Sequence, residues 1–325
     1  ITIDGADDVL SGRAIDGYIE GATIFADADG DRQWDEGEAK TTTGDDGQYT
    51  LTNAEGRLVL KGGDGAIDAA TGLTFKGALE APEGSSVVTP VTTLINKLMD
   101  GFGYDQATAD AAVRSALGLG DDIDNSIDLT TFDPVASVLS DTASTVSMGA
   151  EMARQGVIIE NIVVQAAAVI RGADSSTDTI GWGAATSAVF KAIAHEINSL
   201  AGDTGLSDTV ENFAGLVNGA AVYAGLDPTD QAAAAGAAGD VAEIALAGLV
   251  NLKTVTEAIE DAGTFDPTAY LTALAKSAVV SQTVAASDIQ AAVDGGDTSG
   301  LEASYSGGAL QTKLDNAAVG NVTGS

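Results

Sequence analysis

The hydrophobic pattern of this chain changes character once, at Pro90. Before Pro90 the apolar residues alternate in short runs, such as residues 56–61 and 73–79, which Gly, Asp and Asn interrupt. This pattern is typical of short strands in a small sandwich. After Pro90 the apolar residues recur at helical spacing, beginning with a proline in a first turn and a threonine that can cap it. The sequence therefore predicts a multidomain α+β protein, with an antiparallel β-sandwich over residues 1–88 and an all-α domain over residues 89–295.

Alanine-rich amphipathic segments fill the second part of the chain. Three of them start after an Asp-Pro pair, at residues 133–134, 227–228 and 266–267, which we interpret as an Asp N-cap followed by Pro at the first helical position. The final residues, 296–325, return to Gly, Ser and Thr and are predicted to form an extended tail or an edge strand. The predicted helices cover residues 105–117, 133–171, 182–200, 209–223, 228–261 and 267–292.

The charge balance limits the classes of partner. With 14 basic against 48 acidic residues the net charge is −34, so nucleic acid and anionic membranes are poor partners and divalent cations are natural ones. There is no cysteine, which excludes disulfides and thiolate metal sites. We expect no membrane insertion, because no run of eighteen or more uninterrupted apolar residues occurs. The start at Ile1, without Met or a basic leader, indicates a mature or excised segment.

The most specific chemical signal is an acidic run over residues 27–38. Carboxylates occupy its first, third, fifth, ninth and twelfth positions, the spacing with which a short loop surrounds calcium, and the seventh residue would give its backbone carbonyl. The sixth position normally needs Gly but is Arg32, and the alternating flanks predict that the loop joins strands rather than helices. A solvated acidic turn without metal is the alternative. The predicted calcium ligands are Asp27, Asp29, Asp31, Gln33, Asp35 and Glu38.

Other candidate sites are weaker. A second acidic loop could hold calcium, although a solvated loop is the preferred interpretation; its residues are Asp121, Asp122, Asp124, Asn125 and Asp128. Asp64 and Asp68 flank Gly65 and are interpreted as turn residues, with a third cation site as the alternative. The single histidine, His195, has no second histidine or cysteine for zinc or a catalytic triad. With no nucleophile elbow and no phosphate-binding loop, we expect no enzymatic activity.

Residues 16–27, the acidic loop and residues 43–51 together resemble the calcium-binding B-type β-sandwich modules of large secreted bacterial surface proteins and adhesins. They are similar in the same way to the carboxypeptidase-regulatory-like sandwiches of secreted proteins. With the phrase at residues 88–95, the resemblance covers about the first 135 residues. It implies a secreted or cell-surface location, calcium as a structural ion, and a role in adhesion or assembly without a catalytic site.

These observations lead to one functional prediction and two competitors. We expect a calcium-stabilised extracellular structural protein that self-assembles into a filament, surface layer or matrix. The strand-like ends, residues 1–4 and 318–323, suggest strand addition between copies as the contact. The first competitor is an adhesin that recognises a glycan or a surface protein, and the second is an enzyme with its site in the helical part.

Overall fold

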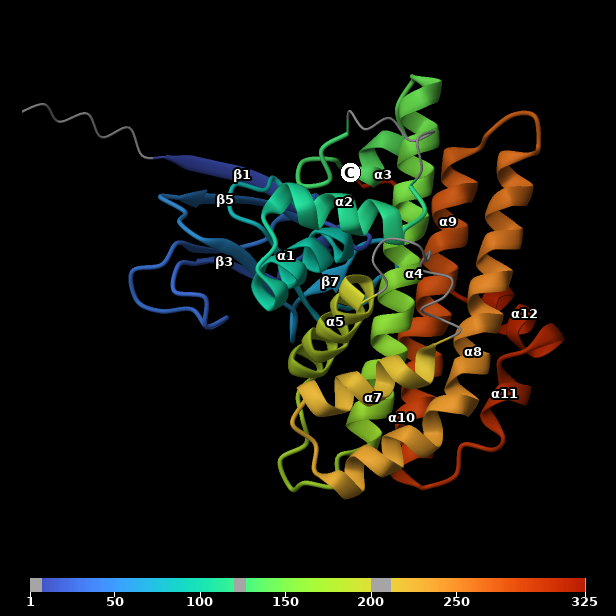
Figure 1. The fold of residues 1–325 in the computed structure, drawn as a ribbon. Coiled ribbons are helices and arrows are strands. Elements are labelled where there is room, and N and C mark those ends of the chain that lie inside the picture. Colours follow the sequence, from blue (N-terminus) through green and yellow to red (C-terminus); the bar gives the residue numbers. More distant parts are fainter. Residues whose placement is uncertain (1–7, 120–126, 200–211, 325) are drawn as a thin grey trace, which may run out of the picture.

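The computed structural model describes residues 8–119, 127–199 and 212–324. Short strands occupy residues 9–88 and helices occupy most of residues 90–316, so the predicted α+β layout is confirmed. Figure 1 shows the strands gathered on one side of the molecule and the long helices standing beside them. The change of pattern at Pro90 therefore marks the step from strands to helices.

Within the described residues, ten strands form three small sheets. The largest has the order β4-β3-β6-β9 and is antiparallel throughout, with Phe25 opposite Val59 and Leu60 opposite Leu79. The other two have the orders β10-β1-β5 and β2-β7-β8. The strands are β1 (Val9–Ala14), β2 (Ile19–Glu20), β3 (Thr23–Asp27), β4 (Lys40–Thr42), β5 (Gln48–Thr52), β6 (Arg57–Lys61), β7 (Ile67–Asp68), β8 (Leu73–Thr74), β9 (Ala78–Ala81) and β10 (Val87–Val88).

One strand pair departs from the predicted antiparallel arrangement. β1 and β10 are parallel, with Arg13 opposite Val87. Two parallel neighbouring strands need a long connection between them. Here strands β2 to β9 form that connection, and β10 then pairs with β1. The pairing places the end of β10 directly before the first helix.

Alternation explains how the strands build a core. Along β5, Tyr49 and Leu51 are buried whereas Gln48, Thr50 and Thr52 are exposed, as expected for a strand with one covered face. On the central strands β3 and β6 the burial is nearly complete. These strands are covered on both faces and give the acidic loop a rigid base.

The helices follow the predicted segments with two interruptions. Residues 133–171 form two helices. Between them the Ser140 hydroxyl oxygen accepts from the Thr142 amide at 3.2 Å, a local bond that competes with the helical hydrogen-bond pattern. Residues 267–292 contain a π-helical segment, Val279–Ala285. The helices are α1 (Pro90–Phe102), α2 (Gln106–Ala116), α3 (Pro134–Val138), α4 (Ala143–Ala173), α5 (Trp182–Ser199), α7 (Phe213–Tyr223), α8 (Pro228–Glu260), α9 (Pro267–Ala278) and α10 (Ala286–Asp294).

Side-chain caps fix where these helices begin. At α1, Thr89 Oγ1 accepts from the Thr92 amide at 3.0 Å, and Thr92 Oγ1 accepts from the Thr89 amide at 2.8 Å. Asp133, Asp227 and Asp266 each cap a helix whose first residue is proline, so the interpretation of the Asp-Pro pairs is confirmed. Such caps contribute roughly 1 kcal/mol each.

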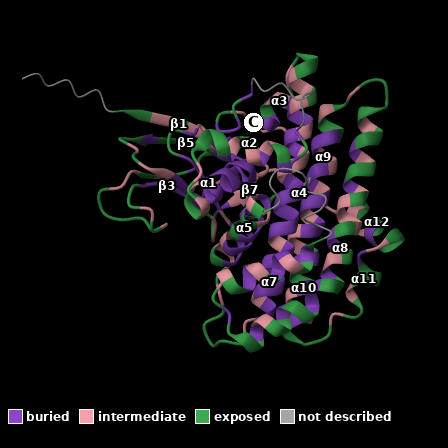
Figure 2. Cartoon of the chain, in the orientation of Figure 1, coloured by how far each residue is buried: buried purple, intermediate pink, exposed green. Residues whose placement is uncertain are grey.

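Helix α4 forms the centre of the helical part. It is long and apolar enough to cross a membrane, but 83% of its apolar window is buried inside the protein, as expected of a core helix. Figure 2 shows this burial along α4, with exposed residues on the outer helices. Buried residues of the sandwich and of α4 belong to one continuous hydrophobic core. The two parts of the chain therefore pack on each other directly.

The predicted extended tail at residues 296–325 is wrong. This region forms α11 (Leu301–Ser304) and α12 (Gly307–Asn316), because Leu301 with Tyr305 and Leu310 with Leu314 place apolar side chains at helical spacing. After α12 the chain returns to the sandwich, where the Gly320 amide donates to the Ala70 carbonyl at 2.8 Å. Residues 318–323 form no strand in this described segment, and residues 1–4 lie outside the described residues.

Candidate metal centre

The acidic loop joins β3 to β4, so the prediction that it connects strands is confirmed. Its first residue, Asp27, is the last residue of β3, and only 1% of it is exposed. β3 pairs with β6 along its whole length, with Asp27 opposite Arg57. The loop thus starts from a fixed point in the sheet.

The structure brings the predicted carboxylates together in two overlapping groups. Ligand oxygens of Asp27, Asp29 and Glu38 lie within 4.8 Å of one another, and so do those of Asp29, Asp31 and Asp35. Asp29 belongs to both groups. All five predicted carboxylates therefore converge around one loop.

Backbone amides hold the first and last carboxylates in place. Asp27 accepts from the amides of Gly30 at 3.0 Å and Arg32 at 3.1 Å. Glu38 accepts from the amides of Ala28 at 2.8 Å and Asp35 at 3.0 Å. Glu38 therefore closes the loop onto its own start. Each carboxylate oxygen has two lone pairs, so these bonds leave capacity for a cation.

Gln33 takes no part in either carboxylate group. The backbone N–H of Gln33 donates to Asp31 Oδ1 at 2.6 Å. Its side-chain Nε2 lies 3.3 Å from Asp31 Oδ2. The side chain thus orients the neighbouring Asp31. A calcium-binding role for Gln33 would use its backbone carbonyl, as the sequence predicts.

Arg32 occupies the position where such loops normally have glycine. Its φ angle is +64° and that of Gly30 is +84°, so both residues adopt the left-handed conformation. The Arg32 side chain leads away from the carboxylates and reaches Glu80 on β9 and Asp100 on α1, at 3.0 and 2.5 Å. The loop makes the required turn at Arg32, and the ion pairs outside the loop support it.

The electrostatics of the loop favour a cation. Partial desolvation and the negative charges of Asp31, Asp29, Glu38 and Asp27 together raise the pKa of Asp35. Arg57 offsets some of this charge, since its Nε lies 3.5 Å from Asp27 Oδ2. Carboxylate oxygens are the ligands that calcium prefers. The donor set fits a hard divalent cation.

The second predicted calcium site is not assembled within the described residues. Asp121, Asp122, Asp124 and Asn125 lie outside them. Asp128 is described, and its Oδ1 accepts from the Thr130 amide at 2.9 Å and from the Thr130 hydroxyl at 2.6 Å. These are the bonds of a turn.

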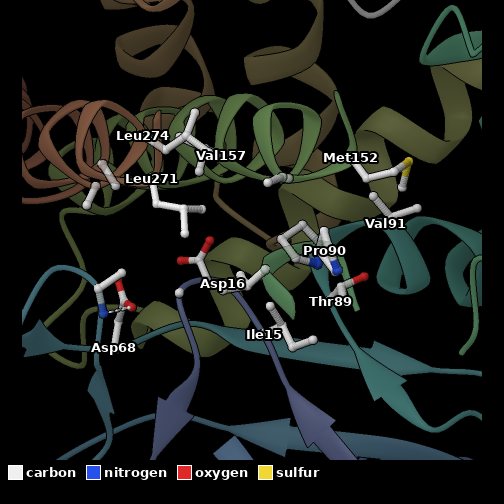
Figure 3. A pocket seen from close by; sticks show the side chains of 18 of the residues that line it. Ile15, Asp16, Asp68, Thr89, Pro90, Val91, Met152, Val157, Leu271 and Leu274 are labelled. Carbon is white, nitrogen blue, oxygen red and sulfur yellow. Dashed lines mark hydrogen bonds between the residues drawn. The ribbon is translucent and has the colours of Figure 1, made fainter. Parts of the chain in front are cut away.

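A second set of carboxyl groups, which no sequence motif connects, lies between the sandwich and the helices. It comprises Asp16, Asp68 and Glu160. Figure 3 shows Asp16 beneath α4 and α9, with its carboxyl group facing Leu271. Asp68 accepts from the Ala70 amide at 3.0 Å and from Thr71 Oγ1 at 2.7 Å, as a turn residue does. One oxygen each of Asp16 and Glu160 is buried and has no partner among the described residues.

Burial governs the titration of these groups. It raises the pKa of Glu160 to about 8, with a further contribution from the charge of Asp68. Burial likewise raises the pKa of Asp68 to about 6, although hydrogen bonds from Thr71 and Ala70 oppose the shift. The pKa of Asp16 is also raised, by burial and by the nearby Glu160 and Asp68. The sequence signal for Glu160 was a lone acid within the apolar run of residues 157–163.

His195 stands apart from both sets. It is exposed on α5, its ring packs edge-on against Phe102 with centroids 5.9 Å apart, and its Nδ1 lies 3.4 Å from Ser199 Oγ. Neither neighbour is a carboxylate. The contacts are those of a surface histidine.

Comparison with protein-family models, curated proteins and solved structures finds no match for this chain.

Proposed function

We propose that this protein is a calcium-stabilised structural component of an extracellular surface or matrix, which self-associates and has no catalytic role. The observation that carries the proposal is the convergence of five carboxylates within the loop between β3 and β4. Without a cation these charges repel one another. Calcium would relieve the repulsion and bind the folded state preferentially, which raises stability.

The outer face of α8 supports self-association. This helix is long and apolar enough to span a membrane, yet only 33% of its apolar window is buried inside the protein. Val250 and Leu246 are 56% and 39% exposed and lie one turn apart on this face, and beyond the exposed Glu243 small residues continue the face toward the start of the helix. Neighbouring large apolar side chains that the rest of the protein leaves uncovered typically mark a contact surface. We assign the contact between copies to this face.

Strand addition through the C-terminal end is a less favourable contact than α8. The Gly320 amide is bonded to Ala70 of the same chain, and Val322 lines the cavity beside Asp16. Residues 318–323 would have to leave these positions before they could join another copy. The α8 face requires no such rearrangement.

The test compares the protein in millimolar calcium with the same protein in excess EGTA. We expect calcium to raise the melting temperature and to produce filaments or sheets in negative-stain electron microscopy. The charge-matched variants D29N and E36Q separate site binding from charge screening, because Glu36 belongs to neither carboxylate group. D29N should abolish the calcium response and E36Q should retain it.

Two results would contradict the proposal. If the melting temperature and the particle size are unchanged in EGTA, calcium does not stabilise this protein. Monomers in both conditions that bind a glycan or a surface protein would instead favour an adhesin.

A further inference from the structure

Basic residues gather at one cleft, although the chain as a whole is strongly acidic. The cleft lies between the edge of the β4-β3-β6-β9 sheet and helices α1, α5 and α7. Five of the 14 basic residues of the chain line it, together with two carboxylates. The basic residues are Arg32, Lys61, Lys76, Lys97 and Lys191.

Two of these cations form a fixed floor with the carboxylates. The Lys97 ammonium pairs with Glu80 and donates to Ser187 Oγ at 2.9 Å, and Lys97 and Glu80 are each at least 96% buried. Burial alone would raise the pKa of Glu80, but the charges of Lys97 and Arg32 outweigh it and keep the pKa below its ordinary value. The floor is therefore charged and rigid, and its carboxylates are already paired.

The other three cations have no such partners. Among the described residues, no carboxylate lies within ion-pair distance of Lys61, Lys76 or Lys191. Lys61 lies over the Phe25 ring at 5.3 Å, and Lys191 lies over the Tyr223 ring at 4.5 Å. In a chain with more than three acidic residues for each basic one, three ammonium groups that line one cleft and have no carboxylate partner form a clear local excess of positive charge.

The size and the walls of the cleft define its ligand. Its volume of about 620 Å³ is that of a site for a small molecule. Tyr223 offers an aromatic wall and Ser187 a hydroxyl beside the ammonium groups. The long-range field of the protein repels anions, so only a ligand that enters the cleft can gain from these charges.

We propose that this cleft binds a compact ligand that carries an oxyanion, such as a sugar bearing a carboxylate or a sulfate, with Lys61, Lys76 and Lys191 as its charge partners. Binding at this cleft requires neither calcium nor self-association. Lys97 and Arg32 both pair with Glu80 and hold the floor of the cleft in place. Tyr223 packs against the body of the ligand.

Titration calorimetry at constant ionic strength tests the proposal with three probes. Glucuronate presents a carboxylate on a sugar, inorganic sulfate presents the oxyanion alone, and glucose presents the sugar alone. We expect saturable binding of glucuronate, weaker binding of sulfate and none of glucose. If sulfate equals glucuronate, a free inorganic anion is the ligand and the proposed sugar acid is wrong.

Paired variants locate the binding. K76Q/K191Q removes two charges from the cleft, whereas K253Q/K313Q removes two that lie outside it. K76Q/K191Q should weaken glucuronate binding at least tenfold, and K253Q/K313Q should leave it unchanged. Equal binding by both variants, or no saturable binding by the native protein, would overturn the proposal. If K76Q/K191Q instead loses self-association and the native protein binds no probe, the cleft receives an acidic segment of a second copy.

Discussion

The Arg32 guanidinium joins the acidic loop to β9, with Nε 3.0 Å from Oε1 of Glu80. Glu80 also pairs with Lys97, so the loop, the sheet and helix α1 share one buried carboxylate. Arg32 thus does two things. Its backbone makes the left-handed turn of the loop, and its side chain holds that turn against the rest of the fold.

The variants R32A and R32G separate these two roles. Both lose the guanidinium and its pairs with Glu80 and Asp100. They differ in the backbone, because alanine at a φ of +64° is strained and glycine is not. We expect R32A to be less stable than R32G by about 1 kcal/mol. Urea unfolding of the two variants measures the difference, and an R32A protein at least as stable as R32G would show that the turn changes after the side chain is lost.

The substitution D35N should change stability with opposite sign in the presence and absence of calcium. The pKa of Asp35 is raised by desolvation and by four neighbouring carboxylates, so the ionised group is unfavourable in the metal-free loop. In EGTA, D35N removes this repulsion and should raise the melting temperature. In saturating calcium it removes a ligand and should lower the melting temperature relative to the native protein.

The matched control for D35N is E36Q, the next residue along the chain. Glu36 is exposed and lies outside both carboxylate groups. E36Q should shift the melting temperature by the same small amount in both conditions. A D35N effect of the same sign in calcium and in EGTA would argue against a metal at this loop.

Much of this fold follows from local sequence patterns. The alternation before Pro90, the threonine cap of α1 and the three Asp-Pro helix starts are each decided by a few neighbouring residues. The acidic loop is equally local, because all its carboxylates lie within twelve consecutive positions. Local signals of this kind can be read without knowing the tertiary structure.

The features that the sequence did not predict depend on tertiary contacts or on weak patterns. Lys61 and Lys191 are far apart in the chain, and only the packing of α5 beside the sheet brings them to one cleft. Glu160 meets Asp68 because α4 packs against the strands. In residues 296–325 the abundant Gly and Ser obscured the helical spacing of Leu301 with Tyr305 and of Leu310 with Leu314.

Glu160 should make the stability of the protein depend on pH. Its folded pKa is about 8 against an ordinary value of 4.5, so between these pH values the folded protein holds a proton that the unfolded chain has lost. The stabilisation is complete below pH 4.5 and is lost as the pH rises through about 8. For this one proton the free energy of unfolding should fall by roughly 1 kcal/mol per pH unit.

The variant E160Q isolates this contribution, because an amide cannot ionise. Its unfolding free energy should fall less steeply than that of the native protein between pH 4.5 and 8. E302Q, at an exposed position on α11, should keep the native slope. Denaturant unfolding across the pH range provides the comparison, and parallel curves for E160Q and the native protein would mean that Glu160 is ionised in the folded state.

The outer face of α8 gives the sharpest test of self-association. The double substitution L246E/V250E places two charges on residues that are 39% and 56% exposed, so folding should be nearly unaffected. Two carboxylates on each copy would repel and remain solvated, which should prevent the apolar faces from meeting. We expect the variant to remain monomeric in calcium by analytical ultracentrifugation, with a melting temperature close to that of the native monomer.

A similar change away from α8 serves as the control. Leu139, after α3, is 38% exposed, and L139E should leave the assembled particles unchanged. If L246E/V250E forms particles of the native size, the contact between copies does not lie on α8. Flotation with lipid vesicles tests whether the exposed face of α8 binds a membrane instead. Vesicle binding by the native protein that L246E/V250E loses, without self-association in solution, would mean that α8 lies against a membrane surface.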